Sequence, residues 1–81
     1  MRPECIDSLI ICNRDIEFAY NGKMYSITKF TDGRPDYISF CEFFKEPVNV
    51  CDSDSLMKIT VEGKTLKEIL SKLPDDAFMI Y

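Results

Sequence analysis

The sequence predicts a single two-layer α+β domain, residues 1–81, in which an antiparallel three-stranded meander and a short C-terminal strand are packed by two helices. Three observations predict this fold. The length of 81 residues leaves room for one hydrophobic core. An Asn-Gly pair separates two segments with alternating apolar residues, as in a tight hairpin. Apolar residues also recur at helical spacing near the start and in the second half of the chain.

The first segment predicts a helix over residues 3–12. Pro3 and Glu4 are typical of a first helical turn, and Asn13 ends the periodic run. The apolar residues between them recur every three or four positions and form one face of the helix: Cys5, Ile6, Leu9, Ile10 and Cys12.

The strongest local signal is the pair Asn21-Gly22 between residues 16–20 and 23–28. Asn-Gly readily takes the two positive-φ positions of a type I′ turn, so the flanking segments form a β-hairpin. A two-residue loop fixes the register, and it gathers four apolar residues on one face: Ile16, Phe18, Tyr25 and Ile27. The opposite face places Glu17 beside Ser26 and Ala19 beside Met24.

Residues 32–35, Asp-Gly-Arg-Pro, predict a second turn, and residues 37–44 predict a third strand that Pro47 closes. Alternation along this strand is imperfect. One face carries Ile38, Phe40, Glu42 and Phe44, and the other carries Tyr37, Ser39, Cys41 and Phe43. We therefore expect both faces of this strand to be partly covered.

The second half of the sequence is predicted to be mainly helical. Two carboxylates and a capping hydroxyl, Asp52-Ser53-Asp54, precede a short helix at about residues 54–59. Thr65 and Glu68 form a capping box that begins a helix over residues 66–73, and Pro74 stops it. The apolar, aromatic-rich residues 77–81 predict a closing edge strand.

The charge balance argues against direct binding of nucleic acid. Ten basic and fourteen acidic residues give a net charge of −4, whereas affinity for phosphates needs an excess of Lys and Arg. The excess is local, because residues 36–54 contain a single Lys and five acidic residues: Asp36, Glu42, Glu46, Asp52 and Asp54. This stretch predicts an acidic surface.

The residue types also argue against an enzyme, so no catalytic residue, metal ligand or cofactor is predicted. The chain has no histidine, the usual general base and the usual activator of a Ser or Cys nucleophile. Gly63-Lys64-Thr65 matches only the tail of a P-loop, because Lys58 stands where the first glycine is needed. Asp52-Ser53-Asp54 matches only the start of a calcium loop, and the spacing of the four cysteines is unlike that of zinc ligands.

The N-terminal region predicts no signal peptide and no membrane segment. Its apolar run, Leu9 to Cys12, is far shorter than a signal-peptide core. We therefore expect a cytoplasmic protein with reduced thiols, in which the four cysteines are small buried side chains rather than disulfides.

The remaining signal is a candidate surface for a protein partner. Tyr20, Phe43 and Phe44 offer aromatic area beside the acidic stretch, and aromatic anchors rimmed by charge are typical of interfaces. The predicted partner-binding residues are Asp36, Glu42, Phe43, Phe44, Glu46, Asp52, Asp54 and Tyr20, and the predicted partner is a protein with a basic groove. The alternatives are that these rings complete the core, or that they form an aromatic pocket for a small molecule or nucleotide, with a homodimer as one way to build it.

Residues 14–28, 38–47 and 62–69, which contain the hairpin, the third strand and the capping box, resemble small uncharacterised proteins of gut Firmicutes and of their phages and mobile elements. The resemblance implies a small α+β fold in a bacterial or phage setting, and it transfers no functional residue. The function expected is a non-enzymatic protein-binding module, specifically an anti-CRISPR-like inhibitor of a host defence factor. The other classes considered are a ligand-sequestering protein and an accessory protein.

Overall fold

The computed structural model describes residues 2–31 and 36–81, so the predicted turn at 32–35 lies outside the described residues. In this part of the chain five strands form one antiparallel sheet in the order β4-β3-β2-β1-β7. The strands are β1 (Ile16–Tyr20), β2 (Lys23–Phe30), β3 (Tyr37–Glu42), β4 (Val48–Val50) and β7 (Phe78–Ile80).

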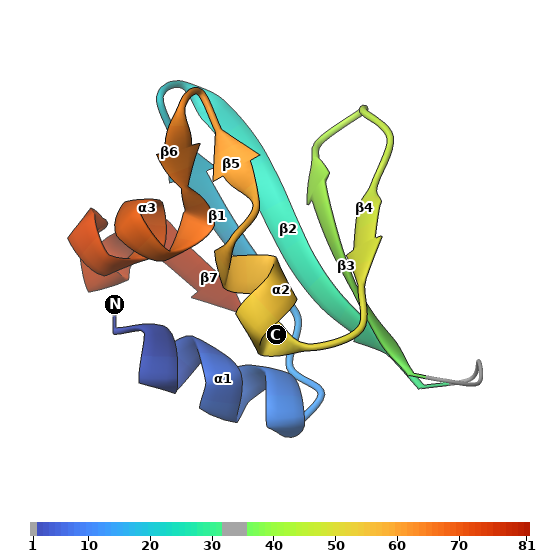
Figure 1. Ribbon diagram of the computed structural model, residues 1–81. Coiled ribbons are helices and arrows are strands. Elements are labelled where there is room, and N and C mark those ends of the chain that lie inside the picture. The colour runs from blue at the N-terminus through green and yellow to red at the C-terminus, as the bar shows by residue number, and fades with distance from the viewer. Residues whose placement is uncertain (1, 32–35) are drawn as a thin grey trace.

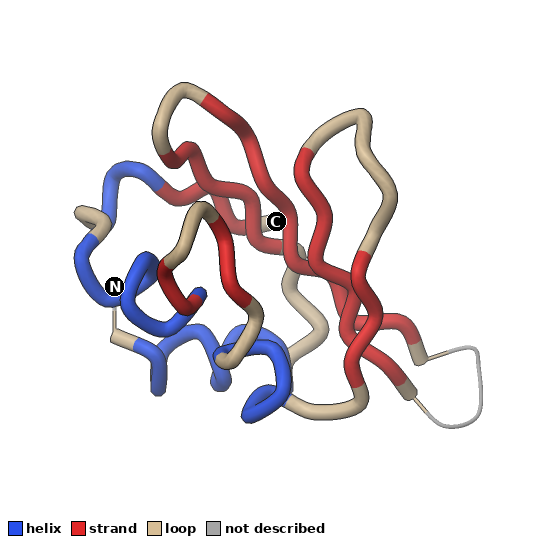
Figure 2. The backbone as a smooth tube through the Cα atoms, turned by 45° about the horizontal axis from the view of Figure 1, so that its top comes forward, coloured by secondary structure: helices blue, strands red, loops and turns tan. Residues whose placement is uncertain are grey.

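A second layer covers one face of the sheet (Figure 1). It contains α1 (Pro3–Ile11), α2 (Ser53–Met57), α3 (Leu66–Lys72), the 3₁₀ turn η1 (Asp75–Ala77) and a small hairpin of β5 (Thr60–Val61) and β6 (Lys64–Thr65). Figure 2 shows the same separation of helices from sheet in a turned view. The predicted two-layer α+β fold is confirmed, as is the predicted closing strand, which pairs with β1 as β7.

The register of the first hairpin is confirmed pair by pair. Tyr20 lies opposite Lys23, Phe18 opposite Tyr25 and Ile16 opposite Ile27. Asn21 and Gly22 both have positive φ, 55° and 77°, as a type I′ turn requires. The local turn signal and the alternating pattern therefore fix the central strands.

The core lies between the two layers. The sheet contributes residues that alternate along its strands, and the helical layer contributes apolar residues from its inner side. Its aromatic centre is Phe18, whose ring centroid lies 5.4 Å from that of Tyr25, 6.4 Å from Phe40 and 5.8 Å from Phe78. The buried residues from the helical layer are at helical spacing on α1 and α3, and α2 adds one more: Ile6, Ile10, Leu66, Ile69, Leu70 and Leu56. On β1, β2 and β3 every second residue is buried, so only one face of the sheet belongs to the core.

Side-chain caps begin the two helices of the second half. Thr65 Oγ1 accepts a hydrogen bond of 3.3 Å from the Glu68 N–H, as the capping box predicts. In α2 the cap is Asp52 rather than the Ser53 hydroxyl, because Asp52 Oδ1 accepts from the Ser55 N–H at 2.8 Å. None of the helices in the described ranges has the length and apolar character needed to cross a membrane.

Two predictions about the core are wrong. The four cysteines are free thiols that are not buried: Cys41 is half-buried and the other three are exposed. On α1 the residues that face the core are Ile6 and Ile10, so the cysteines lie at the margins of the apolar stripe. The third strand also ends at Glu42, so Phe44 lies in a turn and not on the core face.

Candidate functional site

The turn that joins β3 to β4, residues 43–46, is the most unusual surface feature of the molecule, and we call it the aromatic turn. The Lys45 N–H donates to the Glu42 carbonyl at 3.0 Å, which closes a four-residue turn with Phe44 in its third position. Phe44 has φ +68°. This position of a type II turn requires positive φ and normally holds Gly or Asn. A phenylalanine there is strained by about 1–2 kcal/mol.

Hydrogen bonds to the neighbouring strands hold the aromatic turn in place. The Phe43 N–H donates to the Met24 carbonyl at 2.9 Å, which ties the turn to β2. The Cys41 thiol lies 2.9 Å from the Glu42 carbonyl oxygen and 3.2 Å from that of Lys45. These hydrogen bonds therefore fix the strained backbone that carries Phe44.

The two rings of the turn differ in their exposure. Phe44 is fully exposed, whereas Phe43 is half-buried. The rings meet edge to face, with centroids 6.3 Å apart and planes at 89°. They border a shallow hollow of about 220 Å³ together with Met24 and Glu42. An aromatic ring that the fold leaves entirely in water is available to a partner.

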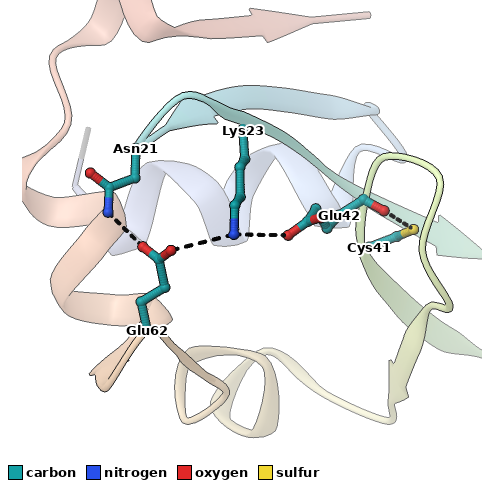
Figure 3. Close-up of polar contacts among 5 residues, drawn as sticks. All are labelled: Asn21, Lys23, Cys41, Glu42 and Glu62. Carbon is teal, nitrogen blue, oxygen red and sulfur yellow. Dashed lines mark hydrogen bonds and ion pairs between the residues drawn. The ribbon is translucent and has the colours of Figure 1, made fainter.

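A chain of polar contacts lies beside the aromatic turn (Figure 3). Asn21 Nδ2 donates to Glu62 Oε2 at 2.6 Å, and Lys23 Nζ lies 3.5 Å from Glu62 Oε1 and 3.9 Å from Glu42 Oε1. The contacts join the tips of the β1–β2 and β5–β6 hairpins to the end of β3. Because these side chains remain between 27% and 48% exposed, the ion pairs orient the groups more than they stabilise the fold.

The pKa shifts follow from this arrangement. The negative charge of Glu42 and then the hydrogen bond and charge of Glu62 raise the pKa of Lys23 above its ordinary value. The hydrogen bond from Asn21, followed by the contact with Lys23, lowers the pKa of the Glu62 carboxyl. Both carboxylate and ammonium are thus held in their charged forms at neutral pH.

A cleft of about 320 Å³ continues from the aromatic turn to the β5–β6 hairpin. Its rim carries three carboxylates and two lysines: Glu42, Glu46, Glu62, Lys23 and Lys45. Tyr25 and Phe40 lie at its floor with parallel rings 5.6 Å apart, and they are only 3% and 5% exposed. The cleft therefore offers an acidic rim and little ring surface.

The structure divides the predicted partner-binding residues into separate groups. Glu42, Phe43, Phe44 and Glu46 come together at the aromatic turn. Asp36 and Asp52 line a different hollow of about 170 Å³ at the other end of β3. At 3.3 Å per residue, six strand residues place these two ends roughly 20 Å apart.

The last two predicted residues lie away from the aromatic turn. Asp54 is exposed in the first turn of α2. Tyr20 is half-buried and packs against the core, and it lines a small hollow together with Val61 of the β5–β6 hairpin and Leu66 of α3. The acidic stretch of the sequence is therefore not one continuous surface.

Sequence reasoning missed Glu62, Lys23 and Asn21. The sequence contains one local signal, the glycine of the Glu62-Gly63 pair. In the structure both residues have positive φ, 53° and 82°, and form a second turn of the Asn21-Gly22 kind. No local pattern, however, indicates that the tips of the two hairpins meet.

Comparisons of the chain with protein-family profiles, curated proteins and solved structures give no match. Within residues 2–31 and 36–81, no three Cys, Asp or Glu side chains are grouped so that they could hold a metal ion. A groove of about 630 Å³ beside α1 is lined by Arg2, Cys5, Ser8, Leu9, Ser71 and Asp75. The feature best suited to recognition is therefore the aromatic turn with its acidic surroundings.

Proposed function

We propose that the protein is a non-enzymatic protein-binding module whose aromatic turn docks on a basic surface of another protein. The observation that carries this proposal is Phe44, a fully exposed ring on a left-handed backbone that hydrogen bonds hold rigidly. Because the ring is not buried, it contributes nothing to the stability of the core, and the backbone that carries it is strained. Strain of this kind concentrates at functional sites.

The energy available from the ring is sufficient for an anchor. Burying a phenylalanine side chain contributes about 1.5–3 kcal/mol, and anchor residues at interfaces contribute about 2 kcal/mol or more. Because the turn is already ordered, docking loses little conformational entropy there. A partner needs an apolar pocket that accepts Phe44.

The charges beside the turn indicate the sign of the charge on the partner's surface. The rim of the adjoining cleft has three carboxylates and two lysines, and the whole chain carries a net charge of −4. Complementary charge speeds encounter and lends specificity, so the partner surface is basic. Basic grooves are where proteins hold nucleic acid. Covering such a groove would inhibit the partner, and inhibition of a host defence nuclease in the anti-CRISPR manner is the specific form we propose.

An aromatic pocket for a small molecule is less well supported. The rings of Tyr25 and Phe40 belong to the core, and Tyr20 is half-buried against it. The acidic rim also disfavours the phosphates of a nucleotide.

The test compares capture of a partner by immobilised protein and its variants. Phe44→Gly removes the ring but suits positive φ, and Glu46→Lys reverses one rim charge. We expect Phe44→Gly to reduce capture of a basic protein at least about tenfold, since an anchor is worth more than about 1.4 kcal/mol. Glu46→Lys should also reduce capture, mainly by slowing association, because a charge at the rim of an interface acts on the association rate. Asp36→Lys is the matched control, because it makes the same charge change at the far end of β3.

Salt gives an independent check, because screening weakens attraction between exposed charges. Capture should fall from about 50 mM to 500 mM salt, where the screening length shortens from about 14 Å to about 4 Å. Equal capture by wild type, Phe44→Gly and Glu46→Lys would contradict the proposed function, as would an acidic partner.

A further inference from the structure

The face of the sheet that points away from the helices is uncovered, and we call it the open face. Figures 1 and 2 show α1, α2, α3 and the β5–β6 hairpin on the other side of the sheet. The centre of the open face consists of three cross-strand pairs on β1, β2 and β3: Ala19 with Met24, Ser26 with Cys41, and Thr28 with Ser39. None of these residues is buried by the chain itself.

The composition of the open face differs from that of an ordinary solvated surface. Asp, Glu, Lys and Arg make up 30% of the sequence. Among the described strand residues on this face, Glu17 alone is charged, and its carboxylate already accepts a hydrogen bond of 3.2 Å from the Tyr81 hydroxyl. Depletion of charge at the centre of a surface is what distinguishes the cores of interfaces.

The side chains of the face suit packing against another sheet. Small side chains occupy its centre, and a stacked pair of rings, Phe30 and Tyr37, lies at one end with centroids 5.1 Å apart. Phe30 remains 38% exposed despite this contact. Two sheets that pack face to face bring such surfaces together in alignment.

We propose that the open face binds a second copy of this chain, forming a reversible dimer through the two sheets. The charge distribution identifies the occupant. Each copy carries a net charge of −4, so two copies repel unless they meet where like charges are absent. The open face comes near this condition, because Glu17 is the one charged residue among its described strand residues, whereas the acidic aromatic turn does not. A basic partner has nothing to pair with on the open face.

The area of the face sets the expected strength. Neighbouring strands lie about 4.8 Å apart, and side chains on one face repeat about every 6.7 Å along a strand, so each residue occupies about 32 Å² of that face. Summed over the strand residues of the open face, the area is on the order of 350 Å². Two copies then bury roughly 700 Å² of projected area, in the range of weak and transient interfaces. The complete core of the single chain agrees with a dimer that dissociates without unfolding.

Sedimentation velocity over roughly 1–500 μM protein tests the proposal. The mass should rise from 9.4 kDa toward twice that value, and high salt should strengthen the dimer because it screens the repulsion. This response to salt is opposite to the one expected for a basic partner. Failure of the dimer is therefore distinguishable from failure of the proposed function.

Two variants with the same chemical change locate the interface. Thr28→Lys places a charge at the centre of the open face and should raise the dissociation constant at least about tenfold. Thr60→Lys makes the same change on exposed β5 in the other layer and should leave the dimer intact. If Thr28→Lys fails to fold by circular dichroism, Ser39→Glu on β3 replaces it. A mass of 9.4 kDa at all concentrations in high salt, or equal dimerisation by wild type and Thr28→Lys, would overturn the proposal.

Discussion

Replacing Phe44 by glycine should leave the protein as stable as before or make it more stable, although it removes an entire aromatic side chain. Phe44 is fully exposed, so its ring contributes no burial to the core. Left-handed φ costs a non-glycine residue about 1–2 kcal/mol, and glycine lacks this strain. Against this, glycine adds about 0.5–1 kcal/mol of entropy to the unfolded chain. The loss of the edge contact with Phe43 takes away up to about 0.5 kcal/mol more.

The net effect on the free energy of unfolding thus lies between about 0.5 kcal/mol of destabilisation and about 1.5 kcal/mol of stabilisation, with a central value of about 0.5 kcal/mol of stabilisation. For a domain of this size 1 kcal/mol shifts the melting temperature by about 4–8 °C, so the change is measurable by thermal and urea unfolding. Gly63→Ala is the reverse control, because it adds a side chain at a positive-φ position. Gly63 has φ +82° and no heavy atom within 4 Å of an added Cβ, so alanine there adds strain alone and should cost about 1 kcal/mol. Destabilisation of more than about 1 kcal/mol by Phe44→Gly would refute the strain argument.

Two further predictions concern the scaffold. Burial and then the charge of Glu42 raise the pKa of Tyr25 above 10.0, so its neutral form stabilises the fold. That contribution is intact below pH 10 and is lost as pH rises through the higher folded pKa, and Tyr25→Phe should show a smaller alkaline fall in urea unfolding. Thr65→Ala removes the cap of α3 and should cost about 1 kcal/mol. If Thr65→Ser costs as much as Thr65→Ala, the cap is not the cause.

The parts of the fold that the sequence predicts correctly rest on local signals. Asn21-Gly22 sets the first hairpin and its register, and the capping box begins α3 at Leu66. β4 was not predicted, because its three residues at the edge of the sheet carry no periodic pattern. The turn before β4 was not predicted either, because Phe44 occupies a position at which Gly or Asn is the usual turn signal.

The candidate site was predicted only in part for a geometric reason. Charges that are close in the sequence lie far apart when an extended strand separates them, as β3 separates Asp36 from Glu42. Conversely, Glu62 reaches Lys23 because two hairpins converge over the core, and this contact depends on tertiary packing. Helical spacing also fails to distinguish the centre of an apolar stripe from its margins, which is why Cys5 and Cys12 on α1 are exposed.

The positive-φ residues of the described chain set Phe44 apart. Besides Phe44, the non-glycine residues in this conformation are Asn13, Asn21 and Glu62. Asparagine tolerates the left-handed region, and Glu62 is compensated because Asn21 and Lys23 hold its carboxylate. The Phe44 ring, by contrast, is fully exposed and lies edge-on to the ring of Phe43. The strain at Phe44 is therefore not offset by contacts that its side chain makes within the fold. We expect it to be offset when the ring binds a partner.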